Sequence, residues 1–247
     1  MGRRSGAKQS SKPSKSNGPE LSPQKSYDLL QNNDKLLRVT SVEYRKVLEN
    51  HSTIEKLIRK AITIESEIDP GFPRRDERTI GEMTKWMLDN GAQIEGVEIR
   101  EMDNFDYGIS AMKDFAEGDL IISVPRKLMM STESAEKSEL GHLSKTDPML
   151  IHMPNVILAL FLLLEKSRGP DSFWSPYIAC LPSSYTTVMY FTGEELAALK
   201  GSPVYELSLK QCQNIARQYV YLRNVFHKSS DAASLILRKH FTYEQYR

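Results

Sequence analysis

The sequence predicts an α+β protein in which a stretch of short β-strands lies between two helical regions. From residue 27 to residue 68, apolar residues recur at the three-to-four-residue spacing of helices. From residue 94 to residue 124, apolar and polar residues alternate instead, as they do in half-buried strands. After residue 131 the helical spacing returns. These changes of period divide the chain into four segments, 1–25, 26–93, 94–130 and 131–247.

Length and composition bound the class of protein. A chain of 247 residues can bury a core of its own. Its net charge of +1 does not predict an acidic binding partner. The longest apolar run, Val156–Leu164, is nine residues, far short of the roughly 20 that span a bilayer. Without a secretory signal, and with Cys180 and Cys212 in apolar surroundings, the expected compartment is the cytoplasm, with the nucleus as an addition.

Residues 1–25 carry six lysines or arginines and six serines, with almost no apolar side chains. Such a segment buries too little surface to offset its conformational entropy, so we expect a disordered basic tail. Its charge is compatible with nuclear import or RNA contact, although a solvated tail is the simpler interpretation, and nucleic acid is not an expected partner.

Two helices are expected between Tyr27 and Ile68, ending at Asp69-Pro70-Gly71. A third helix covers Ile80–Asn90, with Trp86 facing inward and Gly91 as its stop. The strands that follow are Ile94–Ile99, Tyr107–Ile109 and Asp119–Val124, and Pro125 ends the last of them.

The second helical region contains clear start and stop signals. Asp147-Pro148 is typical of a helix start, and Pro154 predicts a break followed by a helix through Leu164 or Glu165. Thr192–Glu195 is a capping box whose short helix stops at Gly201. A long helix, Val204–Phe226, is expected to face the core through Leu207, Cys212, Ile215, Tyr219, Val220 and Phe226.

The end of the sequence has the signature of a helix start. Thr242–Gln245 is such a start, yet the sequence ends one turn later at Arg247. An isolated turn is unfavourable because nucleation fixes several residues for one hydrogen bond. We therefore expect a truncated product, an alternative isoform or a partial gene.

The central strands carry a resemblance to a known family. Phe105–Phe115, followed by Glu117–Ile121, resembles the opening motif of SET domains. Val124–Ser131, Ser172–Ile178 and Leu181–Ser183 resemble the subgroup with a helical insertion, which is related to the plant Rubisco lysine methyltransferase. From about Phe72 onward, the order of motifs is similar to the actin-histidine N-methyltransferase family; the shorter matches are Lys85-Trp86, Asn90–Ala92, Ala216–Tyr219 and Phe241–Arg247.

The resemblance implies an incomplete SET domain of short strands, with a helical lead-in at 26–93 and a helical insertion at 131–247 truncated at its end. It also implies S-adenosyl-L-methionine as the methyl donor and a histidine of actin as the acceptor. The Asn-His, Gly-Glu-Glu and tyrosine segments that carry catalysis in SET domains are expected beyond Arg247, so no catalytic residue is predicted within the chain.

By the same resemblance, Arg75, Phe105, Asp106 and Tyr107 fall on positions that contact the donor, with Gly108 in the turn. A guanidinium and the N–H groups of a tight turn suit the donor's carboxylate. Asp106 departs from the family, which usually has glycine there; aspartate tolerates a positive φ, but its charge repels a carboxylate if it points that way.

The arginine requires an inserted residue in the alignment, so Arg74 or Arg78 is an alternative to Arg75. Without the family, Tyr107-Gly108 is a plain hairpin pair and the arginines form a solvated face.

Asn155 and Arg217 fall where members of the family contact the actin peptide. Their simpler interpretations are a polar residue at a helix start and an exposed helix charge. Two other matches to SET motifs, Asn50-His51-Ser52 and Gly193–Leu196, lie in the wrong order along the chain, and we assign them no catalytic role. The spacing of the five histidines predicts no metal site.

Three functions stay open from the sequence. The favoured one is S-adenosylmethionine-dependent methylation of a histidine of actin. A chain without the second half of the SET core is instead a catalytically silent binding or regulatory product, with uncovered strand edges and low stability. The third is a SET-type lysine methyltransferase.

Overall fold

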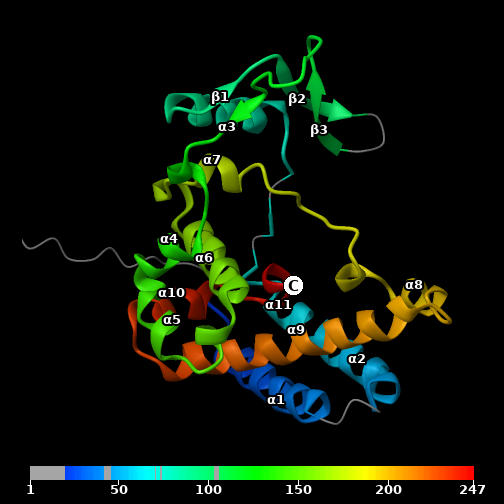
Figure 1. Cartoon of the computed structure of the whole chain (residues 1–247). Helices are drawn as coiled ribbons and strands as arrows, with labels where there is room; N and C mark the ends of the chain where they lie inside the picture. Colours follow the sequence, from blue (N-terminus) through cyan, green and yellow to red (C-terminus); the bar gives the residue numbers. More distant parts are fainter. Residues whose placement is uncertain (1–19, 42–45, 70, 73, 103–105) are drawn as a thin grey trace, which may run out of the picture.

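The computed structural model describes residues 20–41, 46–69, 71–72, 74–102 and 106–247. A helical body occupies the lower part of Figure 1, and a smaller part with the short strands lies above it. The main helices of the body are α1 (Pro23–Thr40), α2 (Val47–Glu65), α6 (Pro154–Arg168), α9 (Pro203–Lys228) and α10 (Ala232–His240). This arrangement has the predicted order of a helical lead-in, short strands and a second helical region.

The first helix begins earlier than the sequence predicts. Ser22 accepts a hydrogen bond from the backbone N–H of Lys25, and Pro23 occupies the first turn, where a missing N–H costs nothing. Residues 23–25, predicted as part of a disordered tail, are therefore helical. Residues 20–22 precede this helix, and residues 1–19 of the predicted tail lie outside the described residues.

The core of the body forms where α1, α2, α6, α9 and α10 meet. Leu36, Phe161, Tyr219 and Phe226 are each at most 1% exposed. One predicted core residue is misplaced, because Leu207 is 60% exposed. It lies in the first turns of α9 on the face opposite Leu209, which is buried against α8 (Gly193–Ala198).

A buried carboxylate fastens the end of the sequence to this core. Glu65, 1% exposed, accepts hydrogen bonds from the Tyr219 hydroxyl at 2.5 Å, from Arg223 Nη1 at 3.0 Å and from the Tyr243 N–H at 2.8 Å. Burial raises the pKa of Glu65, and this outweighs the opposite effect of Arg223.

The helical turn after Thr242, which was predicted to be unfavourable, is held in place by contacts with the body. It forms α11 (Tyr243–Tyr246), whose cap Thr242 accepts from Gln245 and donates to Asp69. Tyr243 and Tyr246 are both buried. A single turn is unfavourable in isolation, but here contacts with distant residues offset the cost of nucleation.

The strands form two small antiparallel sheets. Strand β2 (Val97–Met102) pairs with β3 (Asp106–Ala111), and β1 (Gln93–Ile94) pairs with β4 (Ile122–Ser123). The last strand is much shorter than the predicted Asp119–Val124, and β1 begins at Gln93. Gly91, with φ of 90°, stops α3 (Glu77–Asp89) as predicted and turns the chain into β1.

The insertion also contains short helices: α4 (Thr132–Glu136) and α5 (Leu143–Thr146) precede α6, and α7 (Ser175–Ile178) lies between α6 and α9. The capping box at Thr192 and Glu195 and the helix start at Pro154 are confirmed. Asp147 Oδ1 accepts hydrogen bonds from the N–H groups of Met149 and Leu150 just before a short 3₁₀ turn, Leu150–His152, and no α-helix begins there. Helix α10 was not predicted, although its cap Asp231 accepts a hydrogen bond from the Ser234 N–H.

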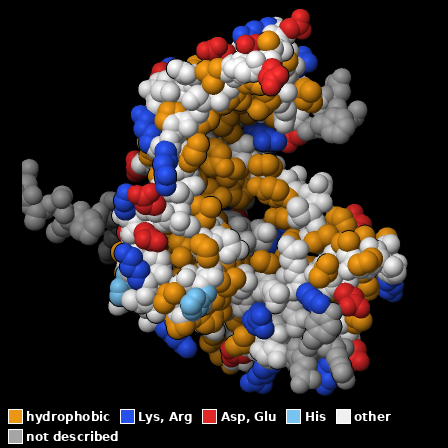
Figure 2. Space-filling model, in the orientation of Figure 1, with side chains coloured by type: hydrophobic (Ala, Val, Ile, Leu, Met, Phe, Trp, Pro, Cys, Tyr) orange, Lys and Arg blue, Asp and Glu red, His pale blue; other side chains and the backbone are white. Residues whose placement is uncertain are grey.

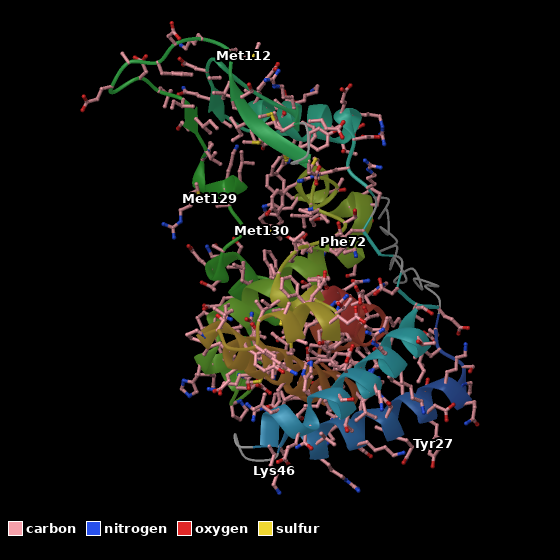
Figure 3. All side chains as sticks on the ribbon, turned by 90° about the vertical axis from the view of Figure 1, so that its right-hand side faces the viewer. Tyr27, Lys46, Phe72, Met112, Met129 and Met130 are labelled. Carbon is pink, nitrogen blue, oxygen red and sulfur yellow. The ribbon has the colours of Figure 1, made fainter. Side chains whose placement is uncertain are left out.

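A row of aromatic rings joins the two parts. Trp86 of α3 meets Phe173 edge-on at 5.4 Å, Phe173 meets Trp174 at 5.2 Å, and Trp174 meets Phe161 of α6 at 5.2 Å. Figure 3 shows that Phe72 and Met130 lie at the level where the chain passes between the parts. No helix in the described ranges is long and apolar enough to cross a membrane.

The passage from α2 to α3 is held by Lys166. Its ammonium donates to the Gly71 carbonyl oxygen at 2.8 Å and lies 3.4 Å from the centre of the Phe72 ring. Burial lowers the pKa of Lys166 from 10.5 to about 8. This contact fixes the linker that leads to the residues of the candidate site.

The lowered pKa predicts a pH dependence of stability. Between pH 8 and pH 10.5 the unfolded chain keeps a proton that the folded Lys166 has lost, so this residue makes the unfolding free energy rise with pH in that window. The difference in unfolding free energy between the native protein and Lys166→Met, measured by urea unfolding at several pH values, should rise likewise. Lys85→Met, whose side chain is 77% exposed, is the matched control. Parallel curves for native and Lys166→Met protein would contradict this prediction.

Candidate functional site

Arg75 lies at the centre of the candidate site. It immediately precedes α3, whose start is fixed by a capping box in which Asp76 and Thr79 bond each other's backbone N–H groups. Arg75 Nη2 lies 2.8 Å from Asp106 Oδ2, and its Nε lies 3.3 Å from Asp106 Oδ1. The Arg75 side chain is 17% exposed and that of Asp106 is 55% exposed. The pair is thus a two-point contact at a partly covered site.

The backbone at the start of β3 directs the Asp106 carboxylate. Asp106 has φ of 59°, and no other non-glycine among the described residues has a positive φ. Its Oδ1 also accepts a hydrogen bond from the Tyr107 N–H at 2.9 Å. The hydrogen bond from Arg75 is the main cause that holds the pKa of Asp106 below its ordinary value, so the side chain is a carboxylate at neutral pH.

A pocket of about 260 Å³ opens beside this pair. Arg75 closes one side, where its Nη1 donates to the Cys180 carbonyl oxygen at 3.1 Å. The Tyr107 ring lies 5.5 Å from the guanidinium carbon. The remaining lining is mainly apolar: Ile80, Met83, Ile99, Gly108, Ile109, Tyr177, Cys180, Leu181 and Pro182. The site is therefore one guanidinium in a mainly apolar wall.

The structure brings together Arg75, Asp106, Tyr107 and Gly108, four of the residues predicted to contact a donor. Phe105 lies outside the described residues. Of the three arginines that the alignment allows, Arg75 is the one that pairs with Asp106 and lines the pocket. Arg78 pairs with Glu82 on the surface, and Arg74 is exposed with only a weak electrostatic effect on Asp106. Gly108 has a packing reason as well, because a Cβ there would lie 3.0 Å from Met102 Cγ.

Three residues that line the pocket, Tyr177, Cys180 and Leu181, were not predicted as site residues. All three lie in or beside the motifs Ser172–Ile178 and Leu181–Ser183. Their place in these motifs was therefore the signal that could have identified them. Cys180 is 6% exposed, its Sγ–H donates to the Thr79 carbonyl, and burial raises the pKa of its thiol. Cys180 therefore has a structural role in the wall of the pocket.

Asn155 and Arg217, predicted to contact a peptide, do not line this pocket. Asn155 is exposed in the first turn of α6, and Arg217 is exposed on α9, where it donates to Asn214. Both remain predictions. Asn50-His51-Ser52 lies inside α2 and Gly193–Leu196 inside α8. The two helices share a pocket lined by residues that include His51 and Leu196. The absence of a catalytic role for both segments stays a prediction.

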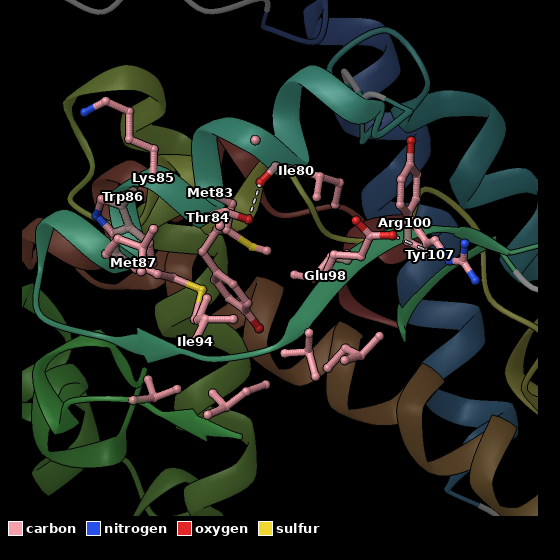
Figure 4. Close-up of a pocket in the computed structure, with 18 of the residues that line it drawn as sticks. Ile80, Met83, Thr84, Lys85, Trp86, Met87, Ile94, Glu98, Arg100 and Tyr107 are labelled. Atoms are coloured by element: carbon pink, nitrogen blue, oxygen red, sulfur yellow. Dashed lines mark hydrogen bonds and ion pairs between the residues drawn. The ribbon is translucent and has the colours of Figure 1, made fainter. Parts of the chain in front are cut away.

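A larger apolar groove of about 980 Å³ lies between α3 and the two small sheets. Figure 4 shows Met83, Met87 and Ile94 on its inner side, with Lys85 pointing away. Figure 2 shows apolar side chains covering the hollowed face between the upper and lower parts. Ile109 is 59% exposed on this surface and Leu88 is 49% exposed. Apolar surface gathered in a groove marks a binding face more often than scattered residues do.

This groove predicts a measurable tendency to self-associate. Ile109→Lys should lower the apparent mass in light scattering at high protein concentration while it changes the unfolding free energy by less than about 1 kcal/mol, because the residue is mainly exposed. Leu207→Lys is the matched control, since Leu207 is 60% exposed but lies outside the groove. Equal effects of both substitutions would show that the groove has no special part in association.

In the part of the chain that the structure describes, no cluster of three or more histidine, cysteine or acidic residues is placed to hold a metal ion. The Arg75 site has the donor set for a carboxylate, because a guanidinium binds carboxylates through paired, charge-assisted hydrogen bonds. A volume of about 260 Å³ is below the roughly 300–1,000 Å³ of drug-sized ligand sites. The pocket therefore fits one end of a larger molecule, namely an end that carries a carboxylate.

The fold places the chain in a known structural class. Rubisco LSMT bound to Sinefungin and Monomethyllysine covers 69% of this chain at a TM-score of 0.58 and 22% identity, and the match covers 38% of that protein. Rubisco LSMT bound to AdoMet covers 68% of this chain at a TM-score of 0.53 and 24% identity, again over 38% of that protein. The helices and strands described above thus have the fold of part of a SET-domain methyltransferase.

The sequence narrows the class further. The chain is 36% identical over 209 residues to Actin-histidine N-methyltransferase of Gallus gallus, 37% identical over 202 residues to that of Mus musculus, and 35% identical over 209 residues to that of Homo sapiens. These matches cover 82–83% of this chain and 34% of each relative. No protein-family model matches the chain. The resemblance to actin-histidine N-methyltransferases is confirmed, and the chain spans about a third of their length.

Proposed function

We propose that this chain forms the donor-binding portion of an S-adenosylmethionine-dependent methyltransferase that modifies a histidine of actin. The observation that carries the proposal is Arg75, a largely covered guanidinium at the mouth of an apolar pocket, held in place by the Cys180 carbonyl. Its fit to a carboxylate matches the amino-acid end of the donor. The similarity to relatives named for actin-histidine methylation supports the choice of acceptor.

In this function, the bound donor supplies an electrophilic methyl group on a sulfonium. Arg75 would hold the carboxylate of the donor, and the Tyr107 ring with the aliphatic wall would exclude water from its chain. A neutral imidazole near physiological pH already offers a lone pair, so little deprotonation is required. The contribution of these residues is therefore to position the donor.

Asn155 and Arg217 are the residues that we propose to contact the actin peptide. Both are exposed on the helical body, one on α6 and the other on α9, so a peptide can reach them. We propose the cytoplasm as the place of action, with the nucleus as a second compartment, because of the basic residues at 1–25. Imaging of a fluorescently tagged chain tests the compartment.

The apolar groove supports a second candidate function. A surface of this kind, between α3 and two sheets with unpaired edges, suits the binding of another polypeptide segment. In this alternative the chain is a catalytically silent binding or regulatory product. The third candidate, a lysine methyltransferase, rests on the fold alone.

One assay separates the three. The full chain is incubated with tritium-labelled S-adenosylmethionine and actin peptides that carry either histidine or lysine at the acceptor position, and donor binding is measured in parallel by calorimetry. Label on the histidine peptide is the result expected of the proposed function, whereas label on the lysine peptide would favour the third candidate. Donor binding without label would favour the silent product, and loss of both binding and label would overturn the donor-binding proposal.

A further inference from the structure

The carboxylate of Asp106 occupies one of the two edges of Arg75 on which a carboxylate can pair through two hydrogen bonds. Two of the three guanidinium nitrogens, Nε and Nη2, each contact one Asp106 oxygen, at 3.3 and 2.8 Å. This is the paired geometry with which arginine binds carboxylates in general. The third nitrogen, Nη1, donates to the Cys180 carbonyl oxygen on the protein side. Three of the five N–H groups of Arg75 are thus paired, and the Nε–Nη2 edge is taken by Asp106.

The backbone holds Asp106 in this position. Its φ of 59° is a conformation that glycine adopts freely and that other residues adopt at a cost. A second hydrogen bond, from the Tyr107 N–H to Oδ1, fixes the side chain toward Arg75. The resembled motif has glycine at this position, so the carboxylate is a feature of this chain and is not required by the turn.

The electrostatics favour the same arrangement. Arg75 is largely covered, whereas Asp106 is more than half exposed. A carboxylate that is half in water can leave the guanidinium at modest cost, since exposed ion pairs contribute little. The Arg75 guanidinium would pay a larger cost, because it would be left as an unpaired charge in a mainly apolar wall. Exchange of one carboxylate for another at Arg75 is therefore more favourable than simple loss of Asp106.

We propose that Asp106 acts as an internal competitor for the methyl donor, which binds by displacing the Asp106 carboxylate from Arg75 with its own. The inference rests on the proposed function and adds an affinity-determining residue to it. Asp106 lowers the affinity for ligands that carry the amino-acid carboxylate and leaves unaffected those that lack it.

The test is a calorimetric titration of the full chain with two nucleosides. S-adenosylhomocysteine carries the amino-acid end, and 5′-methylthioadenosine lacks it. Asp106→Gly suits the positive φ and removes the carboxylate; Asp106→Asn removes the charge while keeping a side chain that tolerates this φ. Glu82→Gln is the matched control, because it removes a carboxylate from the exposed Arg78 pair on the same helix as the capping box.

We expect both Asp106 variants to bind S-adenosylhomocysteine about fivefold more tightly than the native protein, with unchanged affinity for 5′-methylthioadenosine. Glu82→Gln should change neither. Unchanged affinity for S-adenosylhomocysteine in both variants would overturn the competition while leaving the proposed function intact. Weaker binding would overturn it too, by showing that Asp106 holds the ammonium group of the ligand. Failure of every variant to bind either nucleoside would overturn the proposed function together with this inference.

Discussion

Replacing Arg223 with methionine is expected to lower the free energy of unfolding by about 3–5 kcal/mol, because it leaves the buried carboxylate of Glu65 without its positive partner. Arg223 Nη1 donates both to Glu65 and to the Phe241 carbonyl oxygen, at 3.0 and 2.9 Å. The pair joins α2 to α9 and to the segment before α11. Urea unfolding at pH 7, monitored by circular dichroism, measures the loss.

Two controls separate a buried charge from general damage. The double variant Glu65→Gln with Arg223→Met removes both charges and should recover part of the lost stability, since neither ion is left uncompensated. Arg59→Met breaks an exposed pair with Glu55, where the arginine side chain is 67% exposed, and should cost less than about 1 kcal/mol. A loss below about 1 kcal/mol for Arg223→Met would show that the Glu65 network contributes little to the fold.

The second large effect is expected at the candidate site. Arg75→Ala should weaken the binding of S-adenosylhomocysteine by roughly 30-fold or more, because truncating one partner of a largely desolvated charge pair costs about 2 kcal/mol or more. The measurement is a calorimetric titration at fixed salt. Arg78→Ala provides the control, since Arg78 is mainly exposed and pairs with Glu82 instead of Asp106. Equal affinities for the native protein and Arg75→Ala would remove Arg75 from the donor site.

Local signals in the sequence predicted much of the fold. Pro154, Gly91 and the Thr192–Glu195 capping box act within a few residues, and each is where the sequence placed it. The prediction was wrong where distant contacts decide. The last turn, α11, forms because Glu65 and Asp69 bond to its start, and neither is near it in the sequence. Leu207 was wrongly assigned to the core. The spacing of apolar residues shows which face of a helix is apolar, but it does not show how far along the helix that face is covered by other elements.

At the candidate site, too, the features set by distant contacts could not be predicted from the sequence. The resemblance identified Arg75, Asp106 and Tyr107 as one group, although 31 residues separate Arg75 from Asp106. It left open whether Asp106 would point toward the arginine, since that depends on a backbone φ and on a partner supplied by another segment. The part played by the Cys180 carbonyl was not predictable, because any residue type can offer that atom.

The proposed function requires Arg75 to receive the carboxylate of the donor. Nitrogen-15 labelling of arginine side chains allows the Nε–H resonance of Arg75, assigned by its loss in Arg75→Lys, to be followed while S-adenosylhomocysteine is added. We predict that this resonance shifts in proportion to occupancy, while that of Arg59, which is exposed and paired with Glu55, stays in place. An Arg75 resonance that does not move when the nucleoside is bound to saturation would show that Arg75 does not receive the carboxylate.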